Sequence, residues 1–364
     1  MKKSICWVVG IVVIVFAGLF FSDKLQNSAT ASPTMSQEGD RFEVVTIEGE
    51  YSTFLQFPVR FFKESVVGPE AIVQVTDAQY LSLKNMHNSI SPYAFTTIEY
   101  DPEVYGATTY IGIRLGDSAF PKLNNGNPRW EVMSHEQGHN FFGGTSVFYG
   151  TLAFPYPFLQ ESLAVLSAFY TYHDIIDNKI VQLNKETTNS LKYDFTNGRN
   201  YQKGQYELYV NGGSKFNIED TLTSQVLDYK MIEYGEQYSW ENYKKVTKSF
   251  EDGISDRFTF HLDGVSDIEQ STYIIASLGV AFDRDFRDDF RKLNFPIDNN
   301  LYSTVSKKIR DYIDENNLQE QIKKVCSGGK IISEECASLL EKQRKIEGNI
   351  LDTNEAEITN PPTE

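Results

Sequence analysis

The sequence predicts an α+β fold, with a strand-rich N-terminal part followed by a mainly helical part. Residues 41–126 favour strands, because alternating and β-branched runs there are bounded by Gly, Pro and Asp. Residues 127–300 favour helices, because apolar side chains recur there at helical spacing. Strands gathered before helices, in a chain that is 40% hydrophobic and 23% charged, predict a globular α+β protein.

Three stretches predict the strands of the N-terminal part. RFEVVTIEGEYSTFLQF, residues 41–57, alternates between apolar and polar side chains. The β-branched runs AIVQVT and TTYIGIRLG, residues 71–76 and 108–116, are expected to be two more strands. The last of these precedes the helical part, where it is either an ordinary sheet strand or a strand that pairs with an extended peptide.

Helices are expected from residue 127 onward. Asn127 is expected to cap the first of them, with Pro128 at its first helical position and Gly143-Gly144 at its end. Charged amphipathic helices at 301–347 are expected to form a C-terminal extension, and the acidic residues 348–364 a disordered tail. The remaining helices are expected at about residues 158–174, 220–234, 240–250, 267–277 and 283–295.

Residues 1–32 are expected to direct the protein out of the cell. Lys2 and Lys3 precede an uncharged apolar run at 5–21, which is typical of a signal peptide and close to the shortest length that spans a bilayer as a helix. Ala29-Thr30-Ala31 is a candidate cleavage site within a polar linker. A secreted form and a form anchored in the cell membrane both remain open, and the body of the protein is extracellular in either.

The overall charge narrows the class of partner. A formal net charge of -16 argues against nucleic acid and against anionic lipid surfaces, because both require clustered Lys and Arg. The same charge is compatible with cationic substrates, although solubility alone explains it.

The three cysteines predict at most one disulfide. Cys6 lies in the apolar run, whereas Cys326 and Cys336 flank a short loop that a disulfide could close outside the cell. The chain has no Cys-x-x-Cys pair, which argues against zinc sites built from thiolates.

The stretch WEVMSHEQGHNFFGG, residues 130–144, carries the strongest chemical signal. On a helix His135 and His139 share one face, so that two imidazoles can bind one zinc ion. Glu136 is offset by one position, where a general base for a zinc-activated water is needed. Gly138 weakens the helix but allows another backbone to approach closely. A solvated His/Glu face of an ordinary helix is the alternative.

Glu161 is the candidate third ligand. It stands at the start of the next, otherwise apolar helix, and the small residues Ala164 and Ala168 on its face would allow close packing against the histidine helix. The alternative is an acid favoured by the helix dipole near an N-terminus. His135, His139 and Glu161 together would leave one coordination position of a single Zn²⁺ open.

HEQGH followed by a glutamate in Glu161-Ser162-Leu163-Ala164 resembles the gluzincin class of zinc metallopeptidases. The extended motif SHEQGHN is similar to the enhancin-like branch, whose members often act on mucin-type or other surface glycoproteins. Residues 226–246 and 275–297 also resemble that branch, with Ser239 in place of its usual glycine. The resemblance covers roughly residues 108–298 and implies zinc ligands His135, His139 and Glu161.

The resemblance implies a zincin-like catalytic domain at 41–300 with Glu136 as general base. The oxyanion donor of gluzincins is usually a Tyr or His on a later element, and the spacing does not choose among the candidates Tyr209, Tyr229, Tyr234, His261 and Tyr273. The expected function is an exported zinc metallopeptidase that hydrolyses proteins or glycoproteins. The alternatives are an inactive surface binding protein with the same fold and a structural surface protein without metal.

The other histidines give weaker indications of a functional role. His87 is expected in an exposed loop. His173, at the end of the Glu161 helix, is either a surface residue, a cap for the helix carbonyls or a support for the metal site.

Overall fold

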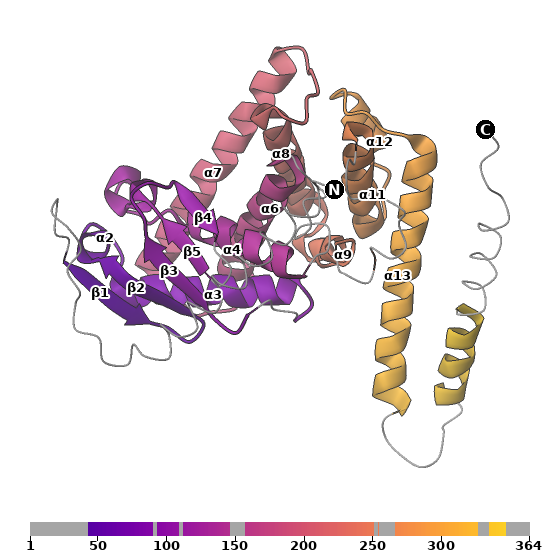
Figure 1. Cartoon of the computed structure of the whole chain (residues 1–364), viewed down its shortest axis with the longest axis horizontal. Helices are drawn as coiled ribbons and strands as arrows, with labels where there is room; N and C mark the ends of the chain where they lie inside the picture. The colour runs from indigo at the N-terminus through magenta and orange to yellow at the C-terminus, as the bar shows by residue number, and fades with distance from the viewer. Residues whose placement is uncertain are drawn as a thin grey trace, which may run out of the picture. The chain divides into compact units, whose positions relative to one another are not determined.

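The computed structural model describes residues 43–89, 93–108, 112–145, 157–250, 254, 266–326 and 335–346. These residues form a small mixed sheet followed by a mainly helical body (Figure 1), which confirms the α+β prediction at this level. The predicted leader at 1–32 and the predicted tail at 348–364 lie outside the described residues. Within the described part of the chain, no helix is both long enough and apolar enough to cross a membrane.

The sheet contains five strands in the order β1-β2-β3-β5-β4. The three inner strands β2, β3 and β5 run parallel, whereas β1 and β4 are antiparallel to their neighbours at the two edges. Phe54, Ile98 and Ile113 stand side by side across the inner strands, and all three are buried. The strand bounds are Val44–Glu48, Ser52–Pro58, Thr96–Tyr100, Gly106–Thr108 and Gly112–Leu115 for β1 to β5.

The sequence prediction for residues 71–76 is wrong. AIVQVT lies inside α3, which spans Pro69–Met86, instead of forming a strand. Pro69 occupies the first helical position, and the buried side chains Ile72, Val75 and Leu83 recur at helical spacing. The packing of that buried helix face therefore outweighs the preference of the Ile and Val side chains in AIVQVT for a strand.

The helical body agrees with most of the expected segments. The expected helix at 158–174 is α6, and the segment expected at 240–250 is split into a short 3-10 helix η3 and α9. The long α7 was not predicted, because few of its residues are apolar. The bounds are Val59–Lys63 (α2), Trp130–Thr145 (α4), Pro157–Ile176 (α6), Lys185–Asn211 (α7), Thr221–Tyr238 (α8), Trp240–Asn242 (η3), Tyr243–Lys248 (α9), Asp267–Phe282 (α11), Arg287–Arg291 (α12) and Asn299–Cys326 (α13).

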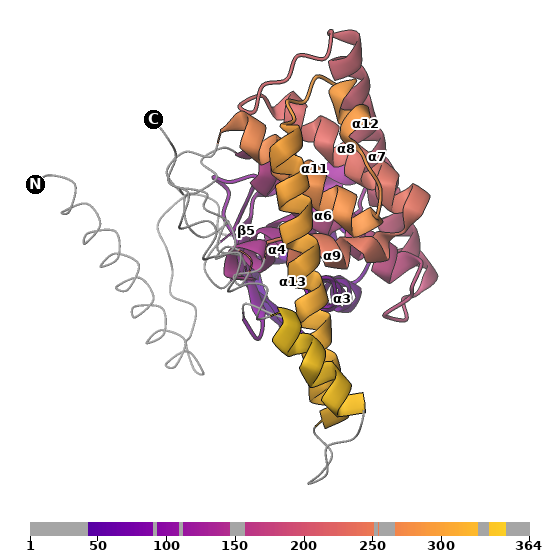
Figure 2. The same ribbon diagram turned by 90° about the vertical axis from the view of Figure 1, so that its right-hand side faces the viewer.

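The C-terminal extension is a helical hairpin. Figures 1 and 2 show α13 lying along α11 and continuing to a second helix at 335–346. A disulfide joins Cys326 to Cys336, with the two Cα atoms 5.4 Å apart, as the cysteine spacing predicted.

The helix that carries the HEQGH motif begins later than predicted. α4 starts at Trp130, and the Asn127 side chain donates to the carbonyls of Asn124 and Asn125 instead of capping the helix. The backbone N–H of Glu131 donates to the Asp194 carboxylate of α7 at 2.9 Å. The helix also continues through the two glycines that were expected to end it, because its last residue is Thr145.

Candidate metal centre

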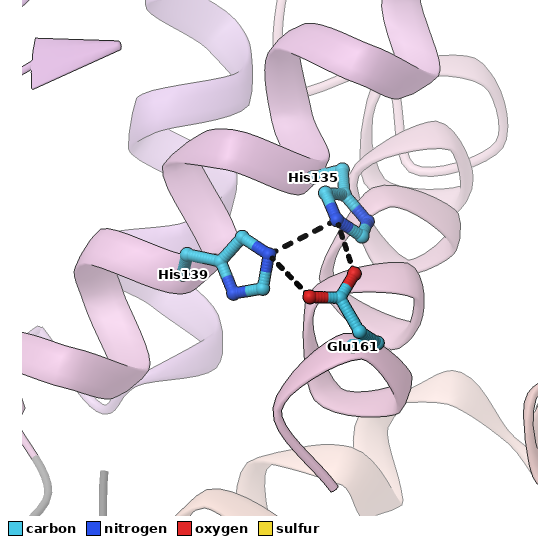
Figure 3. Close-up of side chains that lie close together, drawn as sticks. All are labelled: His135, His139 and Glu161. Carbon is cyan, nitrogen blue, oxygen red and sulfur yellow. Dashed lines mark hydrogen bonds and ion pairs between the residues drawn. The ribbon is translucent and has the colours of Figure 1, made fainter. Parts of the chain in front are cut away.

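Two helices bring three donor side chains together. His135 and His139 project from the same face of α4, and Glu161 projects from the first turns of α6 toward both rings (Figure 3). His135 Nε2 lies 3.0 Å from His139 Nε2 and 3.2 Å from Glu161 Oε2, and His139 Nε2 lies 3.5 Å from Glu161 Oε1. The sequence predicted this set of three residues, and the structure brings all of them to one place.

The spacing of the donor atoms fits a small tetrahedral cation. A zinc ion about 2.0–2.1 Å from each of two donors in tetrahedral geometry requires the donors to be about 3.3 Å apart. The three observed separations of 3.0, 3.2 and 3.5 Å bracket that value. Two imidazoles and one carboxylate are also a donor set that zinc commonly takes in sites with an open fourth position.

The close approach of α4 and α6 explains why Glu161 reaches the histidines. A Cβ atom on Gly138 would lie 2.6 Å from Cβ of Ser167 and 3.3 Å from Cα of Ala164, so α6 occupies the space that a side chain at Gly138 would need. Ala164 and Ala168, the small residues predicted to allow this packing, are fully buried. The two helices can therefore pack at the distance that a shared ion requires.

Asp194 holds the N-terminal end of α4 from outside the helix. Besides the N–H of Glu131, its carboxylate accepts hydrogen bonds from the Tyr172 hydroxyl at 2.6 Å and from Asn124 Nδ2 at 3.1 Å. Since these partners lie on α4, α6 and the segment before α4, one buried carboxylate fixes α4 relative to α6 and α7. A helix start secured in this way cannot be recognised from the local sequence.

Burial and mutual charges shift the pKa values of the three donors, and the shifts of His139 and Glu161 favour the forms that bind a metal. Burial lowers the pKa of His135, but the hydrogen bond with Glu161 and the charge of that carboxylate outweigh burial, so the pKa is raised overall. Burial and the neighbouring His135 lower the pKa of His139 to about 4, so this ring is neutral at pH 7. Burial raises the pKa of Glu161, but His135 and His139 outweigh it, so the net shift is downward and the carboxylate is ionised.

Glu136 stands beside the three donors and outside their set. Its side chain is buried, and burial raises its pKa to about 7. The backbone of β4 approaches it closely, because a Cβ on Gly106 would lie 2.5 Å from Glu136 Oε1. A carboxylate in this position can exchange a proton near neutral pH.

A cleft of about 540 Å³ joins these groups to the edge of the sheet. α4 lies between the β4–β5 side of the sheet and α6 (Figure 1). Gly106 and Ala107 of β4, the last strand in the order of the described sheet, line the cleft. The side-chain exposures of His135, His139 and Glu161 are 17%, 13% and 46%, so a ligand in the cleft can reach all three. The lining residues are Tyr105, Gly106, Ala107, Glu131, Val132, His135, Glu136, His139, Gln160, Glu161 and Val165.

The tyrosines considered as oxyanion donors lie elsewhere. The hydroxyls of Tyr209 and Tyr273 donate to the backbone carbonyls of Leu293 and Ser249, respectively. Tyr234 stacks on Phe286 of the helical body, and Tyr229 packs on Tyr206. None of the four belongs to the described lining of the cleft. His261 lies outside the described residues.

The other histidines occupy different surroundings from those of the cleft. The prediction of an exposed loop for His87 is wrong: the residue is 3% exposed and its ring lies 4.6 Å from that of Phe142, and burial lowers its pKa to about 3. His173 pairs with Asp177 at 3.0 Å and stacks on Trp240 at the opposite end of α6 from Glu161. His173 is thus too far along the helix to support the three donors.

Three residues near the site were not singled out from the sequence. Tyr105 and Glu131 line the cleft. Asp228 of α8 is buried behind Ser162, the residue after Glu161, and burial raises its pKa to about 8. Glu131 could have been recognised, because it precedes His135 by four positions and so shares its helix face. Asp228 could not, because only the packing of α8 on α6 places it there.

Comparisons with known proteins add no relative: no protein-family model matches the chain, and no curated protein matches it either.

Proposed function

We propose that this protein is a zinc-dependent peptidase with a zincin-like catalytic domain, of the gluzincin type and closest to its enhancin-like branch. The observation that carries the proposal is the convergence of His135, His139 and Glu161 in one cleft, with Glu136 beside them. A solvated helix face would not account for a carboxylate that α6 directs toward both rings. The proposed substrate is a protein or glycoprotein outside the cell, since the apolar run at 5–21 favours export.

His135, His139 and Glu161 would hold the ion, and their neutral and anionic forms are those that bind a metal. The chemistry that a bound zinc ion supplies is a lowering of the pKa of water toward about 7 and the polarisation of a carbonyl oxygen. The remaining steps of the reaction belong to the side chains and backbone of this chain.

Glu136 acts as the proton carrier. It takes a proton from a water molecule while the water oxygen bonds to the carbonyl carbon of the scissile peptide. It then passes that proton to the peptide nitrogen as the C–N bond breaks, and the products are a carboxylic acid and an amine. Glu136 is suited to both steps because it is buried and still lines the same cleft as the three donors.

The edge strand β4 is the proposed binding surface for the substrate backbone. Among the described residues β4 pairs with β5 alone, and Gly106 and Ala107 line the cleft. The free hydrogen-bonding groups of an edge strand can pair with an extended peptide. Because Gly106 contacts Glu136, a peptide added to this edge would place one of its carbonyl groups close to that carboxylate.

The full-length protein, purified without added metal, tests the proposal. We expect about one zinc ion per chain by elemental analysis and hydrolysis of unstructured protein substrates that stops with a chelator and returns with zinc. Zinc without turnover on bare or glycosylated proteins would favour a binding protein of the same fold. Absence of bound zinc, together with no zinc uptake in titration, would refute the metal centre itself.

A further inference from the structure

The cleft extends beyond the three donors along α4. Glu131, His135 and His139 are spaced four residues apart and face the same side of α4, and each lines the cleft. Successive positions of this kind lie about 6 Å apart along a helix. The Glu131 carboxylate therefore stands about one helical turn from the candidate metal centre. If a bound peptide has its scissile bond at that centre, a side chain close to this bond lies within reach of Glu131.

The cleft that Glu131 lines also has apolar walls. Val132 of α4 and Val165 of α6 belong to its lining. On its far side the carboxylate packs against α7, since a Cβ on Gly198 would lie 3.3 Å from the Phe169 ring and 3.6 Å from Glu131 Oε2. A long aliphatic side chain would contact these walls and reach the carboxylate with its terminal group.

Glu131 shares its nearest guanidinium with a second carboxylate. Among the described residues, its ion-pair partner is Arg129 at 3.9 Å, beyond hydrogen-bonding distance. Arg129 also lies 4.0 Å from Asp194, and its guanidinium donates to the Tyr105 hydroxyl at 2.9 Å. One guanidinium thus faces two carboxylates, and it makes no hydrogen bond with Glu131 at 3.9 Å.

We propose that Glu131 is a specificity residue that binds the ammonium or guanidinium group of a Lys or Arg side chain in the substrate. This inference rests on the proposed function and names its substrate class. Its side chain is 21% exposed, so the carboxylate is largely desolvated but accessible from the cleft. In such surroundings a charge-assisted hydrogen bond discriminates strongly against an uncharged analogue of the same shape.

The helix dipole explains part of the occurrence of an acid at position 131, because acidic side chains are favoured in the first turn of a helix such as α4. Glu70 provides the matched control for that explanation: it also lies in the first turn of a helix, α3, but is exposed and outside the cleft. An effect of the helix start alone would appear equally at both positions.

Binding is measured first, without turnover. The Glu136→Gln variant of the full-length protein, loaded with zinc, is titrated by calorimetry with two peptides that are identical except for one Lys or norleucine. We expect the Lys peptide to bind roughly 10- to 100-fold more tightly. Adding Glu131→Gln should remove the preference while leaving the affinity of the norleucine peptide and the zinc content unchanged.

Reversing the charge at position 131 gives a more decisive binding experiment. Glu131→Lys should invert the preference, so that a peptide with Glu at the tested position binds better than one with Lys, whereas Glu70→Lys should leave the wild-type order intact. Circular dichroism and zinc content verify that each variant is folded. Equal binding of Lys and norleucine peptides at every peptide position, or an unchanged Lys preference in Glu131→Gln, overturns the inference.

Hydrolysis by the wild-type protein separates this inference from the proposed function. Turnover without a preference for Lys or Arg refutes the specificity role alone. A Lys preference in binding that depends on Glu131, combined with no turnover of any peptide, refutes the peptidase and keeps the subsite.

Discussion

The two ends of α6 each bring a histidine and a carboxylate together, but in different ways. At the N-terminal end, Glu161 meets His135 and His139 of a second helix. At the C-terminal end, His173 meets Asp177 four residues later in the chain. The second pair needs only helical spacing, whereas the first needs two helices in contact. Among the described residues, only the first set contains three potential metal ligands.

This difference shows what a metal centre requires beyond suitable side chains. A local pair such as His173 and Asp177 offers two donors, and the exposed carboxylate remains solvated. Donors from separate helices are held by the packing of those helices, here through Gly138 against Ser167 and Ala164. The packing of the two helices therefore holds the three side chains close together, which is the preorganisation that a metal site requires.

The largest expected effect comes from removing one donor of the N-terminal set. His139→Ala should abolish stoichiometric zinc binding and lower hydrolysis by more than 100-fold. Mutation of a residue that merely hydrogen-bonds to a metal ligand already lowers metal affinity or activity by up to about that factor. His173→Ala, the same change at the other end of α6, should affect neither. Elemental analysis and peptide hydrolysis measure both, and equal losses in the two variants would show that the comparison is mistaken.

Glu136→Gln should separate metal binding from chemistry. The amide cannot accept and pass on a proton, so kcat should fall by about 10²- to 10⁴-fold. Zinc content should stay at the wild-type level, since Glu136 is not one of the three converging donors. Retention of full activity by this variant would exclude Glu136 as the proton carrier.

Gly138→Ala tests the helix contact that unites the donors. The new Cβ would lie 2.6 Å from that of Ser167, so the free energy of unfolding should fall by about 1–3 kcal/mol and zinc affinity should fall with it. Gly204→Ala on α7 is the control, because no atom lies within 4 Å of the added Cβ. There the helix should gain about 0.5–1 kcal/mol. Urea unfolding measures both, and a stabilised Gly138→Ala variant would contradict the close packing.

The smallest effect is expected at the strand that faces Glu136. Gly106→Ala places a Cβ 2.5 Å from Glu136 Oε1, but the carboxylate is the end of a flexible side chain and can move. We expect kcat to fall roughly tenfold, as for a misplaced catalytic group, with zinc content unchanged. An unaltered kcat would mean that the position of Glu136 is not set by β4.

The helices and strands were predicted to different degrees, for physical reasons that particular residues show. The expected helix at 158–174 was confirmed as α6, because its apolar residues are continuous and packing agrees with propensity. AIVQVT was assigned to the wrong element, since the packing of the buried face of α3 outweighs its β-branched side chains, and Pro69 is compatible with a helix start. α7 was missed because its many polar residues give little hydrophobic periodicity.

The sequence by itself determined that His135 and His139 face the same way, because helical spacing is a local property of the chain. It also narrowed the third donor to Glu161, which stands among apolar residues that must be buried. Only the tertiary structure decided that α4 starts at Trp130 under Asp194, that Glu161 reaches both rings, and that Glu131 extends the cleft. These contacts join residues far apart in the chain, and their formation depends on how whole helices pack, which no local spacing encodes.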